Sequence, residues 1–359
     1  MADLGVPTLT ITIKKAAQTV ATRLKNGVAA VIVRDAGVKA GLYVLGSEED
    51  IPTGLGAAVE ANIRRAFLGG EQKPQKVLLV VIGAEDDLVE KGCAALAASD
   101  FDYLAAPSDV DEEAKTALVT WLDGVRKKYC IGKAVLPDHA ADNMAVVNFS
   151  ASGIVVGKET FTGADYCSRI AGLLAGTALS DSATSAPLDE VTAVDEIADA
   201  DAAVAAGKLI LVHDGRKVRL SRAVNSLVTV PEDQSESLKK IKIVEAVDLI
   251  RQQAKVIIDD KFRGKGNSYD TKQLIVSTLY EFLLELEKET VIHEGTSYVE
   301  LNLQKQRAWL KEQGVDVTGM TDEEILKADT GSKIFVKMGG TILDGMEDFD
   351  IEFYMGGNV

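Results

Sequence analysis

The chain has 359 residues, 47% of them hydrophobic and 26% charged, so it has room for two or three globular domains. Its 55 acidic and 39 basic residues give a formal net charge of −16, which disfavours nucleic acid and anionic membrane surfaces as partners. The N-terminus lacks the pattern of a signal peptide, and no apolar run approaches the length of a membrane span. We therefore expect a cytoplasmic protein without direct membrane insertion.

Residues 1–25 are predicted to form an N-terminal arm. Leu9, Ile11 and Ile13 alternate with threonines and Lys14, which is the period of a half-buried strand. No turn signal follows that would fold this strand back as a hairpin. The strand is therefore expected to need a partner from elsewhere.

Residues 26–140 show short apolar segments that alternate with amphipathic helical patterns. The expected strands cover 28–34, 41–46, 76–83, 101–106 and 130–137. This alternation is typical of an α/β domain with largely parallel strand pairing. Because strands and helices alternate throughout, we expect residues 28–136 to bury their own core and to fold alone.

Residues 141–235 form a predicted middle α/β region, with strands within 144–158 and at 208–214. Between them, Thr162 and Asp165 have the spacing of a capping box, which predicts a helix from there to about Gly176. Gly172 and Gly176 lie on one face of this helix and allow another backbone to approach closely. The pattern leaves open whether this helix packs in the chain's own core or against another subunit.

Residues 236–340 are expected to be helical first and β-stranded later. An apolar stripe at Ile243, Val247, Ile250, Ala254 and Ile257 predicts one long helix, and a second is expected around 275–286. The polar segment 263–270 is the turn between them. A third helix is expected at about 302–314 and a strand at 333–338.

Residues 341–359 are predicted to form a C-terminal arm that ends in an amphipathic strand at 348–355. Phe349, Ile351 and Phe353 share one face of this strand. The other face carries the acidic residues Asp348, Asp350 and Glu352.

A search for catalytic and ligand-binding patterns is negative. The three cysteines and three histidines show no metal-ligand spacing, and neither a phosphate-binding loop nor a nucleophile elbow occurs. Gly54 and Gly56 resemble the start of a dinucleotide loop, but no clear strand precedes them. We expect no catalytic residue, no cofactor and no metal, and hence not an enzyme.

The two arms indicate assembly instead. An unpaired strand with one apolar face pairs readily with a neighbouring sheet, and repeated exchange without closure builds a helical filament. The arms also differ in charge: residues 1–25 hold four basic residues, Lys14 and Lys15 among them, against one acidic residue. Residues 341–359 hold five acidic residues and no basic one. We expect these charges to set the register between the arms.

At this point a resemblance becomes specific. The segment GADYCSRIAGLLAGTALSDSATSAPLDEV at 163–191 closely resembles one that recurs in contractile tail sheath proteins. The group concerned is found in phages, defective prophages and phage-tail-like bacteriocins of Gram-positive bacteria. NFSASGIVV at 148–156 and KIFVKMGGTILDGMEDFDIEFYM at 333–355 also look like that family, and the order of elements is similar over the whole chain.

The resemblance implies an α/β fold, α+β overall, with several domains. These are an N-terminal arm (1–25), an outer α/β domain (26–140), a middle region (141–235), a helical and β-stranded domain (236–340) and a C-terminal arm (341–359). It implies subunits that stack as hexameric rings around an inner tube, held together by the arms, and that contract to drive the tube through a target envelope. The implied partners are other copies of the chain, the tube protein, and baseplate and tail-terminator proteins, with assembly in the bacterial host cytoplasm.

The helical region also carries the candidate contacts to the tube, because basic residues concentrate there. Between 236 and 265 eight basic residues face five acidic ones. The candidates are Lys239, Lys242, Arg251, Lys255, Lys305 and Arg307. A solvated helix face is the other interpretation of this pattern, and a soluble α/β enzyme or another filament-forming tail protein are the alternatives for the whole chain.

Overall fold

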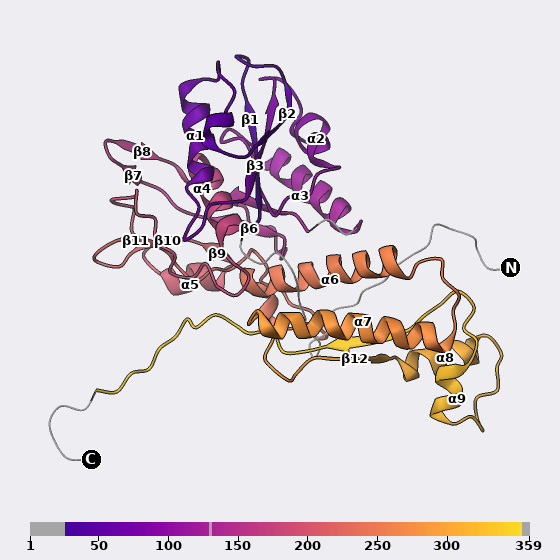
Figure 1. Ribbon diagram of the computed structural model, residues 1–359. Coiled ribbons are helices and arrows are strands. Elements are labelled where there is room, and N and C mark those ends of the chain that lie inside the picture. Colours follow the sequence, from indigo (N-terminus) through magenta and orange to yellow (C-terminus); the bar gives the residue numbers. More distant parts are fainter. Residues whose placement is uncertain (1–25, 129–130, 354–359) are drawn as a thin grey trace.

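The computed structural model describes residues 26–128 and 131–353. Within these ranges an α/β body is built around one large sheet, and a layer of two long helices lies below it in the view of Figure 1. After residue 348 the chain extends away from both parts (Figure 1). The predicted mixed α/β class is therefore confirmed.

Seven strands form the sheet of the body: β1 (Val28–Arg34), β2 (Gly41–Leu45), β3 (Lys76–Ile82), β4 (Tyr103–Ala105), β5 (Lys133–Pro137), β6 (Val146–Phe149) and β9 (Lys208–Leu209). Their order is β2-β3-β1-β4-β5-β6-β9, and every neighbouring pair is parallel except β2 with β3. The predicted parallel pairing is confirmed.

Helices cover both faces of this sheet. One face packs against α1 (Ala57–Phe67), which follows the short turn Glu48–Asp50, and against α4 (Gly163–Gly176). The other face packs against a π-helical turn (Leu88–Cys93), α2 (Ala94–Leu96) and α3 (Glu112–Arg126). In β1, Val31 lies in the first apolar cluster and its neighbours Ala30 and Ile32 in the second. Successive side chains of a strand point to opposite faces, so a sheet covered on both sides needs continuously apolar strands.

The sheet passes through the boundary expected at residue 140. β6 and β9 come from the middle region 141–235, and α4, from the same region, contacts β1, β4 and β5. Without α4, one face of the sheet is left without much of its apolar cover. We therefore correct the expectation that residues 28–136 bury their own core, because α4, β6 and β9 complete that core and its sheet. How the whole chain divides into independently folding units stays a prediction.

Helix α4 belongs to the chain's own core, which answers the question left open by its sequence. The predicted capping box is present: the Asp165 backbone N–H donates to Thr162 Oγ1 at 3.3 Å, and the Asp165 carboxylate accepts from the Thr162 backbone N–H at 3.1 Å. Twelve of its 14 residues are buried. A Cβ at Gly172 would lie 1.9 Å from the carbonyl oxygen of Ala66 in α1, so only glycine allows this approach.

Smaller elements flank the body: the hairpin of β7 (Ile154–Val156) and β8 (Glu159–Phe161), helix α5 (Ala200–Ala205), and the pair β10 (Leu211–His213) and β11 (Val218–Leu220). The single strand expected at 208–214 is wrong. Residues 208–209 pair with β6, whereas 211–213 pair with β11, so the chain changes partner at Ile210.

The C-terminal layer contains α6 (Ile241–Lys261), preceded by a short turn (Glu236–Lys239), α7 (Tyr269–Lys288), α8 (Leu303–Glu312) and α9 (Asp322–Lys327), with strands β12 (Tyr298–Leu301) and β13 (Val336–Gly339). The three predicted helices are confirmed. The strand expected at 333–338 begins three residues later, because β13 pairs with β12 only from Val336 to Gly339.

A buried polar cluster joins α6 to the body. Asp248 accepts hydrogen bonds from Arg126 at 2.6 and 2.8 Å, and Lys133 Nζ lies 3.5 Å from the same carboxylate. Glu245 accepts a hydrogen bond from the Tyr103 hydroxyl at 2.6 Å. Buried charges are tolerated only when they are paired and hydrogen-bonded, so these contacts specify where α6 crosses the body.

Candidate assembly surfaces

Residues 343–353 of the C-terminal arm are called the C-terminal segment below. This segment carries the most exposed large apolar side chains in the described part of the chain. Phe349, Ile351 and Phe353 are 71%, 81% and 82% exposed, and Met346 is 87% exposed. Residues 343–353 belong to no strand, so the strand predicted from residue 348 does not form within the described chain. A strand requires a second strand to satisfy its backbone N–H and C=O groups, and this segment pairs with none in the described ranges.

The acidic residues of this segment fall into two groups. Asp344 lies 2.6 Å from Lys240 Nζ, and Asp348 lies 2.5 Å from a guanidinium nitrogen of Arg222. The hydrogen bond to Asp348 raises the pKa of Arg222 above its usual value. Asp350 and Glu352 lie beyond these contacts and are exposed. Asp348 was expected to recognise the other arm by charge, but it already has a cationic partner in its own chain.

The strand predicted in the N-terminal arm cannot be compared with the structure. Leu9, Ile11, Ile13, Lys14 and Lys15 lie outside the described residues. Their role as intersubunit contacts therefore rests on the sequence pattern.

Strands β12 and β13 form an antiparallel pair with one apolar and one polar face. Val299 lies opposite Met338, and both pack against the cores of the helical layer. On the other face Lys337 Nζ lies 3.0 Å from Glu300 and 5.2 Å from the centroid of the Tyr298 ring. This sheet has two strands in the described chain, so each strand has an outer edge that another strand could join.

The candidate tube contacts are mostly engaged within the chain. Lys239 pairs with Glu236 at 2.6 Å, Lys255 with Asp259 at 2.5 Å and Arg307 with Asp322 at 2.5 Å. Arg251 donates to the carbonyl oxygen of Arg126. Lys305 is exposed.

Lys242 does not fit a surface role. Its side chain is buried, and its amine donates to the carbonyl oxygen of Ser180 at 2.6 Å. Burial also lowers the pKa of Lys242. The remaining candidates are spread out, because the start of α6 and helix α8 lie at opposite ends of the layer (Figure 1).

The carboxyl ends of the parallel strands, where α/β proteins usually bind ligands, are occupied by the protein itself. Arg34, at the end of β1, donates to the carbonyl oxygens of Gly83, Ala84 and Asp86 at 3.3, 3.1 and 2.7 Å. These hydrogen bonds attach the loop after β3 to the end of β1. The polar side chain at this edge of the sheet therefore binds a loop of the protein.

His139 follows β5 at the same edge. Its Nδ1 lies 3.0 Å from the Glu112 carboxylate, and hydrogen bonds from Lys115 and His139 lower the pKa of Glu112. No nucleophilic side chain of the described residues is hydrogen-bonded to His139. The arrangement joins the N-terminus of α3 to the loop after β5, and it offers no acid–base pair beside a nucleophile.

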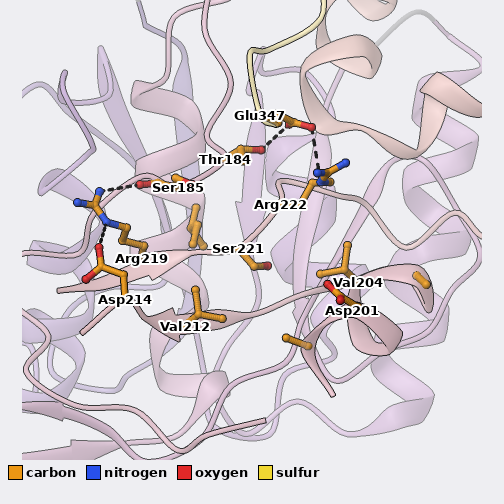
Figure 2. Close-up of a pocket in the computed structure, with 13 residues that line it drawn as sticks. Thr184, Ser185, Asp201, Val204, Val212, Asp214, Arg219, Ser221, Arg222 and Glu347 are labelled. Atoms are coloured by element: carbon orange, nitrogen blue, oxygen red, sulfur yellow. Dashed lines mark hydrogen bonds and ion pairs between the residues drawn. The ribbon is translucent and has the colours of Figure 1, made fainter. Parts of the chain in front are cut away.

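Figure 2 shows a cavity of about 580 Å³ between α5, β10, β11 and residues 184–185. Arg219 on one wall pairs with Asp214 at 2.5 Å and donates to the carbonyl oxygen of Ser185 at 3.0 Å. The hydrogen bond from Arg219 holds the pKa of Asp214 far below its usual value. The cavity therefore presents paired charges. Its opposite wall contains Glu347, at the root of the C-terminal segment (Figure 2).

Among the described residues, no group of three or more His, Cys, Asp and Glu side chains is placed to hold a metal ion. No helix in the described ranges has the length and apolar character needed to cross a membrane. Cys93 is buried, and burial raises the pKa of its thiol to about 12, which suppresses the reactive thiolate.

Sequence patterns did not reveal the residues that hold the start of the C-terminal segment, residues 344–348 (its root), against the rest of the chain. Glu347 was counted only as one of several acidic residues, and Lys240 and Arg222 were not singled out. Lys240 and Arg222 each lie more than 100 positions before Glu347 in sequence and meet it only in the folded chain. No spacing pattern could have revealed them.

Comparison with known proteins shows the family of this chain. Residues 83–226 match the family described as the phage tail sheath protein central domain. The tail sheath protein of Clostridium phage phiCD119 is 36% identical over 361 residues, which cover 98% of this chain and 99% of that protein.

Solved sheath structures share the fold at low sequence identity. The helical sheath of the anti-feeding prophage in its contracted state matches with a TM-score of 0.66 and 15% identity, covering 99% of this chain and 100% of that one. A sheath tail protein from Listeria innocua matches with a TM-score of 0.64 and 14% identity, covering 90% of this chain and 96% of that one. This chain belongs to the phage tail sheath family and is a structural subunit of a tail sheath.

Proposed function

We propose that copies of this chain polymerise as stacked hexameric rings around an inner tube and contract to drive that tube through a target cell envelope. Similar chains occur in a contracted helical sheath and in a baseplate of the anti-feeding prophage, which supports other copies of the chain and baseplate proteins as partners. The family resemblance adds tube and terminator proteins to the proposed partners. Assembly would occur in the bacterial host cytoplasm, and the sheath would leave as part of the released particle. The exposed apolar C-terminal segment is the observation that carries this proposal.

The proposed link between subunits is strand exchange. Phe349, Ile351 and Phe353 together expose a row of large apolar side chains, which is unfavourable in water and marks a protein contact. The segment also brings its own backbone donors and acceptors. Both needs are met when it joins the edge of a sheet in a second copy.

The β12–β13 sheet suits this role in the neighbouring copy. Its apolar face already packs on the helical layer, so the apolar row of an added strand would extend the same core. The acidic row would continue the face that carries Glu300 and Lys337. A two-stranded sheet gains stability from each added strand, so both partners benefit. We assign the N-terminal arm, with Leu9, Ile11 and Ile13, to the same kind of exchange.

Contact with the tube is proposed for the basic residues outside the core: Lys239, Arg251, Lys255, Lys305 and Arg307. Lys305 carries this part of the proposal best, because it is exposed. We expect Lys305→Glu to weaken co-sedimentation with tube protein at moderate salt, while sheath self-assembly continues. Unchanged co-sedimentation would remove Lys305 from the interface.

Deletion tests the strand exchange. Removal of residues 349–359 keeps the contacts of residues 344–348 and should leave a folded monomer that forms no sheath in negative-stain images. The matched control is Glu232→Gln, which alters one exposed side chain outside the segment and should assemble normally. Normal sheaths from the truncated chain would refute the exchange.

Crosslinking locates the receiving sheet. A photo-crosslinking amino acid at position 351 should join residues of β12 or β13 in assembled sheath. In mixtures of isotopically light and heavy subunits, the crosslinked peptides should combine both labels. Crosslinks confined to one label would mean that the segment binds its own chain.

A further inference from the structure

Glu347 differs from the other acidic residues in the described part of the C-terminal arm. Its side chain is 4% exposed, although Met346 beside it is 87% exposed. A carboxylate removed from water in this way is stable only with several donors around it. Glu347 has them, and they come from three separate segments of the chain.

One carboxylate oxygen of Glu347 accepts from Thr184 Oγ1 at 2.6 Å and from Ser182 Oγ at 3.4 Å. The other lies 2.9 Å from Lys240 Nζ and 3.6 Å from Arg222 Nε. These charge-assisted contacts are among the stronger polar interactions in proteins. Figure 2 shows the side chains of Thr184 and Arg222 both reaching the carboxylate of Glu347.

Neighbouring residues strengthen the same attachment. Asp344 shares Lys240 with Glu347, and Asp348 binds Arg222. A Cβ at Gly345 would lie 2.7 Å from Cβ of Ser182, so the backbone fits closely against the body here. The exposure of the chain rises sharply at the next residue, because Phe349 is 71% exposed.

We infer that Glu347 is the anchor of the C-terminal arm, and that the arm pivots between residues 348 and 349. This inference rests on the proposed strand exchange. The anchor fixes the position at which residues 349–353 leave the body. Because this segment is short, a fixed starting point limits it to one neighbouring sheet and to one register on that sheet. Glu347 is thus a positioning residue that acts through residues 349–353 and does not itself meet the neighbour.

The anchor also changes the expected charge recognition between arms. Asp344, Glu347 and Asp348 are engaged within the chain, so we expect Asp350, on the outgoing strand, to face a second copy. Charge reversal at Asp348 would therefore loosen the root as well as alter the arm, and its effects would not report on arm recognition alone.

Proteolysis of the monomer tests the anchor without assembly. Chymotrypsin cleaves after large apolar residues, and mass spectrometry can separate cuts after Phe349 or Phe353 from cuts after Leu343 or Met346. In the natural chain we expect the first two sites to be cut first. Glu347→Gln removes the charge but keeps the size, and should speed cleavage after Leu343 and Met346 about tenfold. Unchanged cleavage at these two sites would overturn the anchor.

Assembly then tests positioning. Glu347→Gln should reduce the yield of regular sheath several-fold, whereas Glu232→Gln, which removes one exposed charge elsewhere, should leave cleavage and assembly unchanged. If Glu347→Gln loosens the root and sheaths form with normal yield and regularity, the positioning role is wrong. Failure of the exchange itself looks different, because the chain lacking residues 349–359 would then form normal sheaths.

Discussion

Helix α4 and the C-terminal segment carry equally clear apolar patterns, but their surroundings differ completely. Twelve of the 14 residues in α4 are buried, whereas Phe349, Ile351 and Phe353 are 71–82% exposed. A helix satisfies its own backbone hydrogen bonds and needs only an apolar surface to cover it. A single strand needs a second strand as well. An apolar row on a strand without a partner therefore points outside the chain.

The closest packing in α4 predicts the largest effect. Gly172→Ala would place a methyl group 1.9 Å from the Ala66 carbonyl oxygen, a contact that requires α1 and α4 to move apart. We expect a loss of about 3 kcal/mol in the free energy of unfolding, measured from the urea midpoint. Gly124→Ala on α3 is the matched control, because a Cβ at that position would meet no other part of the protein within 4 Å. It should stabilise the chain by about 0.5–1 kcal/mol. Equal effects at both glycines would contradict the close helix contact.

The second effect concerns the polar side of α4. Glu190 lies 2.6 Å from Arg169, whose side chain is 4% exposed. Burial opposes ionisation of Glu190, but the hydrogen bonds from Arg169 and Tyr166 outweigh it and hold the pKa of Glu190 below its ordinary value. Glu190→Gln should cost about 2 kcal/mol near neutral pH, because it weakens the partner of a buried arginine.

The pH dependence of that cost follows from the direction of the pKa shift. The folded-state pKa of Glu190 is lowered, so its stabilising contribution is complete above its unfolded-state pKa. It is lost as pH falls through the folded-state value. The stability difference between the natural chain and Glu190→Gln should therefore shrink in acid. Urea unfolding at several pH values measures it, and a difference that grows in acid would contradict the assignment.

Substitutions in the C-terminal segment are expected to have a much smaller effect on the free energy of unfolding. Replacing Phe349, Ile351 and Phe353 by serine should change the free energy of unfolding of the monomer by less than about 0.5 kcal/mol, because these side chains are already in water. The same change should abolish sheath formation. A clear loss of monomer stability would show that the segment packs on its own chain.

The reactivity of cysteine thiols compares the exposure of α4 with that of the C-terminal segment. The substitution needed for this comparison should not change the free energy of unfolding. Cys167 lies in the core-facing helix α4, and burial raises the pKa of its thiol. A cysteine introduced as Ile351→Cys would lie on the exposed segment. Under native conditions iodoacetamide should modify position 351 rapidly and leave Cys167 intact, as peptide mapping would show. Rapid modification of Cys167 would mean that α4 opens readily.

The sequence by itself was sufficient to predict the helices and strands that are specified by neighbouring residues. The strands of the body are continuous apolar runs, the capping box of Thr162 and Asp165 marks the start of α4, and the stripe from Ile243 to Ala254 marks α6. Each depends on residues within a few positions of one another, so period and capping chemistry specify them. The family resemblance was carried in the same way, by contiguous segments.

The tertiary structure decided what depends on distant residues. Gly172 faces Ala66, Lys242 is buried against Ser180, and Glu347 meets Lys240 and Arg222; none of these pairs shows in a local pattern. A lysine on a helix looks the same in sequence whether it faces water or a carbonyl oxygen. The sheet crosses the boundary expected at 140 for the same reason, because sheet membership depends on which strands pair and not on their order along the chain.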